Sequence, residues 1–309
     1  MKRYLVTGAA GFIGSAMVQR FVNEADEVWT IDNLSTGFRE NIPKGVAFIE
    51  GDCQAPESIA LLHRTKFDAV IHLAGQSSGE ISFDDPVYDL RTNTESTLRL
   101  IKYSLENGCE RFIYASSMSV YGEVEDKPIS ESHPAKPLSF YGVGKLASEN
   151  YMRIYASKGL KSTSLRLFNV YGPGQNMGNL RQGMISIFLA QLIKHDKVVV
   201  KGPLDRFRDF IFIDDCVDFV IRIIEDERTY GGIYNVGTGM RTTVEELLKK
   251  MMKISGIEKQ IILGKGTPGD QKGIYADISL AQSQLGFICR YSLDEGLAKM
   301  IDWAKTSTW

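Results

Sequence analysis

The chain has 309 residues, of which 43% are hydrophobic and 24% are charged, and its formal net charge is −2. These numbers predict a soluble globular protein of one large or two ordinary domains. The nearly balanced charge gives no general reason to bind nucleic acid or an acidic membrane surface. No apolar run approaches the roughly 18 residues that a membrane span requires.

The cysteines and histidines point to no metal. The four cysteines are far apart and form no Cys-x-x-Cys pair, and the four histidines lack the spacing of metal ligands. We therefore expect reduced thiols, no metal site and a cytoplasmic location. The N-terminal stretch MKRYLVTGAAGFIG has an apolar part that is short, interrupted by glycine and without a clear cleavage site, which argues against a signal peptide.

Short apolar runs alternate with amphipathic segments through the first half of the chain. Strands are expected at 3–8, 27–33, 46–52, 68–75, 111–117 and 162–172. Helices are expected at 12–24, 56–64, 87–107 and in the segment that carries Tyr141. This alternation predicts an α/β fold in which helices cover both faces of a doubly wound parallel sheet.

The pattern loosens after Tyr171. A polar loop rich in glycine and asparagine is expected at 172–183, followed by a helix, two strands, a helix and a strand at 184–195, 197–201, 208–213, 214–226 and 232–237. The last 70 or so residues resemble a smaller α/β lobe. We therefore predict one domain of residues 1–170 plus 212–238, a second of residues 171–211 plus 239–309, and a cleft between them.

The stretch TGAAGFIG places Gly8, Gly11 and Gly14 at a strand-to-helix turn. Glycines there permit a tight turn, a close approach of backbone to a pyrophosphate, and close helix–strand packing, and the helix N-terminus favours phosphate. The alternative is a glycine-rich turn without a ligand. The context favours a Rossmann-type dinucleotide site, because the motif opens a strand–helix–strand unit.

Two acidic residues follow that unit. Asp32 ends the second strand, where a carboxylate accepts hydrogen bonds from ribose hydroxyls and repels a 2′-phosphate, so NAD is favoured over NADP. Asp52 ends the third strand and is a candidate for binding the adenine amino group. A plain solvated turn acid is an equal alternative for Asp52.

Residues 139–149, SFYGVGKLASE, place Tyr141 and Lys145 four residues apart, so a helix puts both side chains on one face. An ammonium beside a phenol lowers the pKa of the phenol, which suits acid–base chemistry. The alternative is an ordinary exposed helix face.

Several short motifs occur together in one order: TGAAGFIG, DNLSTG, GD at 51–52, HLAGQ at 72–76, ASSMSVYG at 115–122 and Tyr141-x-x-x-Lys145. This ordered set resembles the extended short-chain dehydrogenase/reductase family that acts on nucleotide-linked sugars, in its nucleotide-sugar epimerase branch. The resemblance covers nearly the whole chain. It implies an NAD-dependent 4-epimerase of the UDP-glucose/UDP-galactose type, which oxidises C4 transiently and returns the hydride to the other face.

The resemblance also implies the site residues. Ser117, Tyr141 and Lys145 are the expected catalytic group, with Ser116 as the rival serine; Lys145 and a positive nicotinamide ring are expected to lower the pKa of Tyr141. The implied cofactor-binding residues are Gly8, Gly11, Phe12, Ile13, Gly14, Asp32, Asn33, Asp52, Cys53, Leu73, Ala74, Gly75, Gln76, Asn93, Tyr141, Lys145 and Phe168. The implied substrate-binding residues are Ser117, Asn169, Arg206, Arg208 and Ile274.

Two departures from the family pattern bear on the reaction and the substrate. The dehydratases of the family carry an Asp-Glu pair after the catalytic serine, where this chain has Met118-Ser119, so dehydration is disfavoured. Thr267 stands where the family has a second phosphate-binding arginine, and Arg206 is our candidate replacement for that charge. A paired surface arginine is the alternative for Arg208. Ile274 leaves N-acetylated and plain sugars both open.

The resemblance further implies a homodimer built on two helices, one over 84–108 and one after Tyr141. Leu98, Leu100, Ile101 and Leu105 would then be partly buried in the interface, unless this stripe faces only its own sheet.

Competing functions remain to be distinguished. One is another enzyme of the family, a 4-ketoreductase, a dehydratase or a 2- or 3,5-epimerase acting on a non-UDP sugar. The other is an NAD-sensing regulator without turnover. Asp32 argues against an NADPH-dependent reductase, and the intact catalytic group argues against a sensor.

Overall fold

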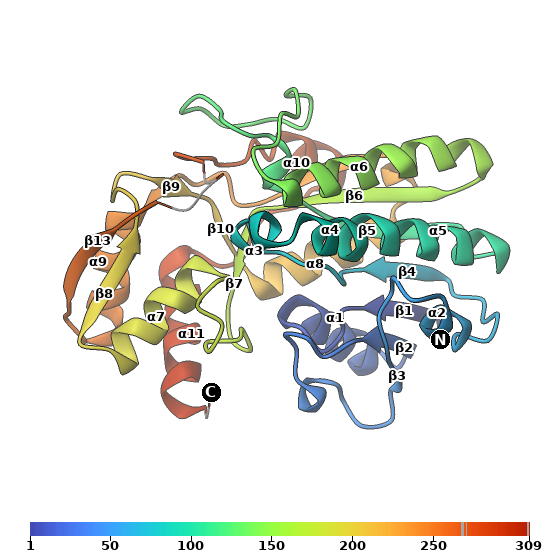
Figure 1. Ribbon diagram of the computed structural model, residues 1–309, viewed down its shortest axis with the longest axis horizontal. Coiled ribbons are helices and arrows are strands. Elements are labelled where there is room, and N and C mark those ends of the chain that lie inside the picture. The colour runs from blue at the N-terminus through green and yellow to red at the C-terminus, as the bar shows by residue number, and fades with distance from the viewer. Residues whose placement is uncertain (267–268, 270, 308) are drawn as a thin grey trace.

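A seven-stranded parallel sheet forms the centre of the N-terminal lobe, as the computed structural model shows (Figure 1). The structure describes residues 1–266, 269, 271–307 and 309. In spatial order the strands are β3 (Ala47–Glu50), β2 (Glu27–Asp32), β1 (Arg3–Thr7), β4 (Ala69–His72), β5 (Arg111–Ser117), β6 (Lys161–Leu167) and β11 (Ile233–Val236). The predicted α/β fold with a doubly wound parallel sheet is therefore confirmed.

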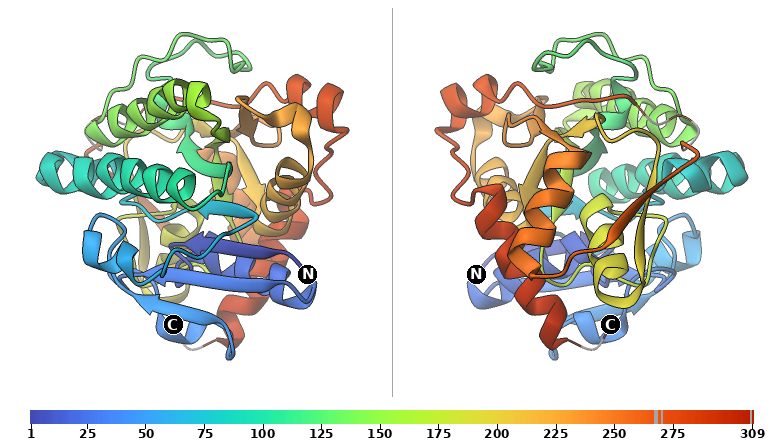
Figure 2. Two further views of the ribbon diagram at one scale, coloured as in Figure 1. Left: turned by 90° about the vertical axis from the view of Figure 1, so that its right-hand side faces the viewer. Right: turned by 90° about the vertical axis from the view of Figure 1, so that its left-hand side faces the viewer.

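Helices cover both faces of this sheet (Figure 2). Helices α1 (Phe12–Asn23) and α8 (Ile213–Glu225) pack together on one face. The other face carries α2 (Pro56–Ala60), α5 (Ser96–Glu106) and α6 (Phe140–Tyr155). The chain runs outward from β1 in both directions, so the strand order reverses between β1 and β4. A ligand crevice is expected at the carboxyl ends of strands at such a point.

The predicted helix over 87–107 is divided into three parts. Helix α4 (Pro86–Leu90) is followed by a π-helical turn (Arg91–Glu95) and then by α5. Hydroxyl groups bond back to the backbone here, with Thr92 Oγ1 donating to Tyr88 O at 2.7 Å and Ser96 Oγ to Thr92 O at 2.5 Å. Such turns accompany functional sites, because the wider coil re-aims its side chains.

Two other predicted elements differ from the structure. Helix α2 ends at Ala60, and the backbone then turns through His63 and Arg64, which both have positive φ. The single strand predicted over 162–172 is two strands, because β7 (Asn169–Tyr171) leaves the main sheet and pairs with β10 (Phe210–Phe212).

The smaller lobe lies at the side of the main sheet where α7, α9 and α11 are found (Figure 1). It contains two further strand pairs, β8 with β13 and β9 with β12. Its elements are α7 (Met184–Lys194), β8 (Lys197–Lys201), β9 (Phe207–Arg208), β12 (Thr242–Thr243), α9 (Val244–Ser255), β13 (Gln260–Gly264), α10 (Ser279–Leu285) and α11 (Leu293–Thr306). The remaining helix, α3 (Gly79–Asp84), precedes α4.

The hydrophobic core continues from the sheet into the smaller lobe. One cluster joins Val6 of β1, Phe21 of α1 and Phe219 of α8 to Leu189 of α7 and Leu247 of α9 in the smaller lobe. The lobes therefore share buried apolar surface. A second cluster fills the opposite face of the sheet beneath α2 and α5. Among the described residues, no helix has the length and apolar character needed to cross a membrane.

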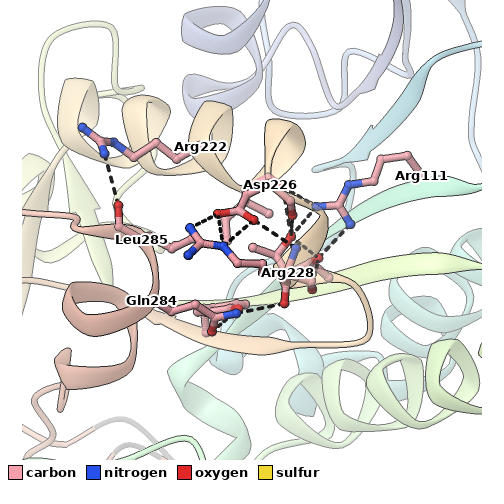
Figure 3. A network of polar contacts seen from close by, with 10 residues as sticks. Arg111, Arg222, Asp226, Arg228, Gln284 and Leu285 are labelled. Carbon is pink, nitrogen blue, oxygen red and sulfur yellow. Dashed lines mark hydrogen bonds and ion pairs between the residues drawn. The ribbon is translucent and has the colours of Figure 1, made fainter.

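A buried arginine joins β5 and β6 to the end of α8 (Figure 3). The Arg111 guanidinium donates to Thr163 Oγ1 and Thr229 Oγ1, both at 2.8 Å, and to the carbonyl oxygens of Lys161 and Ile223. It also lies 4.7 Å from the Tyr230 ring centroid. Burial lowers the pKa of Arg111 to about 10. Arg228 beside it forms an exposed ion pair with Asp226.

Replacing Arg111 by Met should destabilise the fold, because the acceptors around the guanidinium would stay buried without donors. We expect a loss of about 3 kcal/mol in the free energy of unfolding, measured by urea denaturation. The matched control is Arg228→Met in the exposed pair, which should leave the melting temperature unchanged. Equal losses in the two variants would contradict this account of Arg111.

Candidate functional site

A cleft of about 400 Å³ opens at the carboxyl ends of the central strands. It brings together nearly every residue predicted to bind the cofactor. Those that line it are Gly8, Gly11, Phe12, Ile13, Gly14, Asp32, Asn33, Asp52, Cys53, Leu73, Ala74, Gly75, Gln76, Tyr141, Lys145 and Phe168. Residues that lie far apart in the sequence thus share one concave surface, at the place where the strand order reverses.

The glycine loop has the shape expected of a phosphate-binding turn. Gly8 has a φ of +70°, and a Cβ atom on it would lie 2.7 Å from the backbone nitrogen of Ala74. A Cβ on Gly14 would collide with the Gly8 carbonyl oxygen. Side chains are therefore excluded at both positions. Helix α1 begins after Gly11, so its first backbone N–H groups and its positive dipole end face the cleft.

Asp32 is held at the end of β2. Its carboxylate accepts hydrogen bonds from the backbone N–H groups of Ala10, at 2.9 Å, and Leu34, at 2.8 Å. These bonds fix the carboxylate beside the glycine loop, and it remains part of the cleft lining. Asn33 donates to Asp52 at 3.0 Å, which links the ends of β2 and β3. The glycine cradle and the adjacent carboxylate fit an adenine dinucleotide.

The predicted catalytic residues come from β5 and α6. Helix α6 begins at Phe140, and the Ser139 hydroxyl caps it by accepting from the backbone N–H of Gly142 at 3.1 Å. Tyr141 and Lys145 both lie on the buried face of this helix. Lys145 Nζ donates to the Ala115 carbonyl oxygen at 2.8 Å and is 5.6 Å from the Tyr141 ring centroid. The exposed-face alternative for this pair is wrong.

Burial dominates the electrostatics of these two side chains. It raises the pKa of Tyr141 to about 12, although the Ser117 hydroxyl hydrogen-bonds the phenol and lowers the pKa in part. Burial also lowers the pKa of Lys145 to about 8, against the charge of Asp89. The expected depression of the Tyr141 pKa by Lys145 is therefore not achieved by the protein's own groups, because desolvation of the phenolate is the larger effect.

The hydroxyl groups of the two rival serines have different hydrogen-bond partners. Both serines line the cleft, and the Ser117 hydroxyl, 3.2 Å from Ser119 Oγ, hydrogen-bonds the Tyr141 phenol. The Ser116 hydroxyl donates instead to Glu149 of α6, at 2.5 Å. This arrangement favours Ser117 as the serine that meets a substrate.

Glu149 is itself paired with a buried arginine. Arg166 of β6 makes a bidentate contact with it, from Nε at 3.0 Å and Nη2 at 2.8 Å, and both side chains are at most 5% exposed. This ion pair raises the pKa of Arg166, although burial opposes it. The pair joins α6 to β6, and the Ser116 bond to Glu149 joins α6 to β5, directly behind the predicted catalytic residues.

Sequence reasoning missed two parts of the site. Asp89 is buried beside Lys145 and accepts a hydrogen bond from Asn93, which lies beneath the cleft. The sequence feature that could have pointed to Asp89 is a run of polar residues in a helix that faces the sheet. The polar loop after Gly172 supplies the opposite wall, with Gln175, Asn176, Asn179 and Gln182. The unusual amide content of that loop was the available signal.

The predicted substrate-binding residues divide into two groups. Ser117 and Asn169 line the cleft, and Asn169 Nδ2 donates to the Asp209 carbonyl oxygen at 3.1 Å. Arg206, Arg208 and Ile274 are buried outside that lining. Arg208 Nη2 donates to Gln271 O at 2.9 Å, and Ile274 packs in a cluster with Phe168. Thr267 lies outside the described residues.

Comparisons with known proteins agree with this geometry. The model of the NAD-dependent epimerase/dehydratase family matches residues 4–237. A putative UDP-glucose 4-epimerase of Methanocaldococcus jannaschii is 32% identical, over 98% of each chain. The dTDP-4-dehydro-6-deoxyglucose reductase of Escherichia coli is also 32% identical, over 96% of each chain.

Two solved structures are similar over almost their full length. The UDP-glucose 4-epimerase of Thermus thermophilus in complex with NAD has a TM-score of 0.93 and 31% identity, covering 99% of this chain and 100% of that one. The UDP-glucose 4-epimerase of Thermotoga maritima with UDP-glucose has a TM-score of 0.94 and 32% identity, covering 98% of each chain.

Replacing Arg166 by Met should destabilise the protein strongly, because Glu149 would stay buried without its partner. We expect a loss of about 3–5 kcal/mol in the free energy of unfolding, measured by chemical denaturation. The double variant Glu149→Gln/Arg166→Met should recover part of this loss, since it removes the stranded charge. A double variant that loses the full sum of the two single losses would contradict the coupling of the pair.

Proposed function

Because this chain belongs to the NAD-dependent epimerase/dehydratase family, we propose that it is a nucleotide-sugar 4-epimerase of the UDP-glucose/UDP-galactose type. The observation that carries the proposal is the meeting of Ser117, Tyr141 and Lys145 with the glycine loop in one cleft. The substrate is a nucleotide-diphosphate sugar, and no nucleic acid or membrane takes part.

NAD is the cofactor of this family, and the residues present fit it. Gly8 and Gly14 allow the tight turn and the close packing at the start of α1, whose N-terminus would hold the pyrophosphate, and Asp32 in the cleft lining would accept hydrogen bonds from the ribose hydroxyls. When bound, NAD accepts and returns a hydride, and the positive charge of its oxidised ring favours the phenolate of Tyr141.

The chain's own residues move the proton. The Tyr141 phenolate accepts the proton of the sugar 4-hydroxyl as C4 is oxidised, and gives it back when the sugar is reduced from its other face. Ser117 hydrogen-bonds the reacting oxygen and the phenol. Lys145, fixed by its bond to the Ala115 carbonyl, places a positive charge behind the ring of Tyr141.

The residues after Ser117 favour epimerisation over dehydration. Met118 and Ser119 both line the cleft, and neither side chain carries a carboxyl group for acid–base work at C5 and C6. The runner-up is another reaction of the family on a non-UDP sugar. The reductase relative supports a 4-ketoreductase as its specific form, and turnover without added cofactor separates the two reactions.

We propose that Asn169, Arg206 and Arg208 bind the substrate diphosphate, and that Ile274 limits the sugar subsite from behind Phe168. Asn169 in the cleft lining supports the first role. The support for the two arginines is that Arg208 lies on β9 and Arg206 directly precedes this strand. An arginine fork suits a diphosphate.

The two-domain division also stays a proposal. Residues 1–170 plus 212–238 would bind NAD and residues 171–211 plus 239–309 the nucleotide sugar. The main sheet supports this division, since all of its strands fall within the first set of residues. A cytoplasmic location is supported by the four cysteines, all of which are free thiols.

We propose a homodimer formed through α4 and α6. Val87 and Leu90 on α4 are 58% and 57% exposed, and Val143 and Ile154 on the adjacent α6 are 53% and 54% exposed. Such an exposed apolar face on neighbouring helices favours association. The prediction that the apolar stripe on α5 contributes to the interface is wrong for Leu100 and Ile101, because both are fully buried against their own sheet.

Replacing Tyr141 by Phe should abolish the proton transfer and leave the cleft intact. We expect the rate of UDP-galactose formation from UDP-glucose to fall roughly 10²- to 10⁴-fold, while bound NAD, measured after acid release, stays at the wild-type amount. Tyr151→Phe, on the outward side of the same helix, is the control and should be as active as wild type. An unchanged rate in Tyr141→Phe would exclude it as the base.

The double variant Val143→Glu/Ile154→Glu should separate the subunits, because it buries charge in the proposed interface. Light scattering coupled to size-exclusion chromatography should report a dimer for wild type and a monomer for the variant. Ile288→Glu, at an exposed apolar residue elsewhere, should remain dimeric. A monomeric wild type at micromolar concentration would refute the proposed dimer.

A further inference from the structure

Asp89 is a buried carboxylate at the edge of the active site for which the mechanism above has no use. It lies at the end of α4 and is 1% exposed. Its Oδ1 accepts hydrogen bonds from Gln76 Nε2 at 2.8 Å and from Asn93 Nδ2 at 3.0 Å. Its Oδ2 lies against α6, 3.5 Å from the position that a Cβ atom on Gly144 would occupy. Gly144 directly precedes Lys145 in the chain.

Asp89 determines which way the Asn93 amide points. Asn93 Nδ2 donates to the Gln76 carbonyl oxygen at 2.9 Å as well as to Asp89. A flipped amide would place its oxygen against two acceptors, so only one orientation is satisfied. Asn93 Oδ1 is then buried without a hydrogen-bond partner. This oxygen lies 2.5 Å from the position that a Cβ atom on Gly75 would occupy, and Gly75 is part of the cleft lining.

Lys145 is on the same side of Gly75. Its Nζ would be 3.4 Å from that Cβ, so the ammonium and Asn93 Oδ1 flank one glycine. We propose that Asp89 is a positioning residue of the active site: its carboxylate orients the Asn93 amide, and its charge holds Lys145 as an ammonium ion. Asp89 itself is not part of the cleft lining.

The charges around Lys145 make this role necessary. Lys145 is fully buried, and its Nζ lies 4.9 Å from the Tyr114 ring centroid and 5.6 Å from that of Tyr141. His72 of β4 is also buried there, and burial lowers its pKa to about 3, so it stays neutral. The Ala115 carbonyl and the two rings also favour the ammonium, and among the charged side chains near Lys145 in the described chain Asp89 supplies the negative charge that raises its pKa.

The same charge acts on Tyr141, where it raises the pKa of the phenol. Removing it should lower the pKa of both Lys145 and Tyr141. Because activity requires a protonated Lys145 and a deprotonated Tyr141, both limbs of the pH profile should move to lower pH. A purely structural role for Asp89 would lower activity at every pH without moving the limbs.

The direct test measures Lys145 rather than turnover. Protein labelled with [ε-¹³C]lysine is titrated by NMR, and the Lys145 signal is assigned by its loss in Lys145→Arg. The Asp89→Asn variant keeps an acceptor for Gln76 and Asn93 but removes the charge. We expect the Lys145 midpoint to fall by about one pH unit. Asp85→Asn, which removes an exposed charge from the N-cap of the same short helix, should leave the Lys145 midpoint unchanged.

The kinetic test rests on the proposed function, whereas the titration does not. In Asp89→Asn, both limbs of the kcat/KM profile should shift to lower pH, and Asp89→Glu should restore the wild-type profile. A Lys145 midpoint that is equal in wild type and Asp89→Asn would overturn the proposal even in an active enzyme. Should Asp89→Asn fail to fold, the wild-type titration still decides: a Lys145 midpoint of about 7 or above supports the proposal, and a midpoint below about 7 contradicts it.

Discussion

The docking of α6 on the ends of β5 and β6 is the constraint on which the site depends. Three side chains one turn apart on this helix, Tyr141, Lys145 and Glu149, face the sheet, and two of them bond to β5. The buried pair of Glu149 with Arg166 extends this attachment to β6. A buried ion pair with satisfied hydrogen bonds contributes little net stability but disfavours any other register. The position of the Tyr141 phenol relative to Ser117 follows from it.

The same packing explains why two conflicting demands meet in one place. A phenol must lose its proton and an amine must keep one, yet both are buried, and burial opposes the charged form of each. In our proposal, the Asp89 carboxylate on α4 favours the charged form of Lys145, and the charge of the bound cofactor favours the phenolate of Tyr141. In the proposed reaction the site is electrostatically incomplete until NAD binds, which would couple proton transfer to cofactor binding.

Much of this could be predicted from the sequence. Glycine spacing and strand periodicity depend on local chemistry, so the cleft-lining glycines, Asp32 and the Tyr141–Lys145 face were predicted. Asp89 was not identified, because its burial against α6 and its contact with Gln76 depend on the tertiary fold. The lowered pKa expected for Tyr141 from Lys145 and a nicotinamide ring stays a prediction for the NAD-bound enzyme, since the sequence shows a nearby lysine but not that burial opposes it in the protein alone. The placement of Leu100 and Ile101 likewise needed the sheet.

The central claim is that Tyr141 and bound NAD carry out a reversible oxidation at C4. The most direct measurement mixes the purified protein with UDP-glucose in D₂O, without added cofactor, and follows the anomeric protons by NMR. The account predicts that UDP-galactose appears with no deuterium in the sugar ring, because the hydride that leaves C4 is the one that returns. Deuterium at a ring carbon, or turnover only when a reduced cofactor is added, would contradict it.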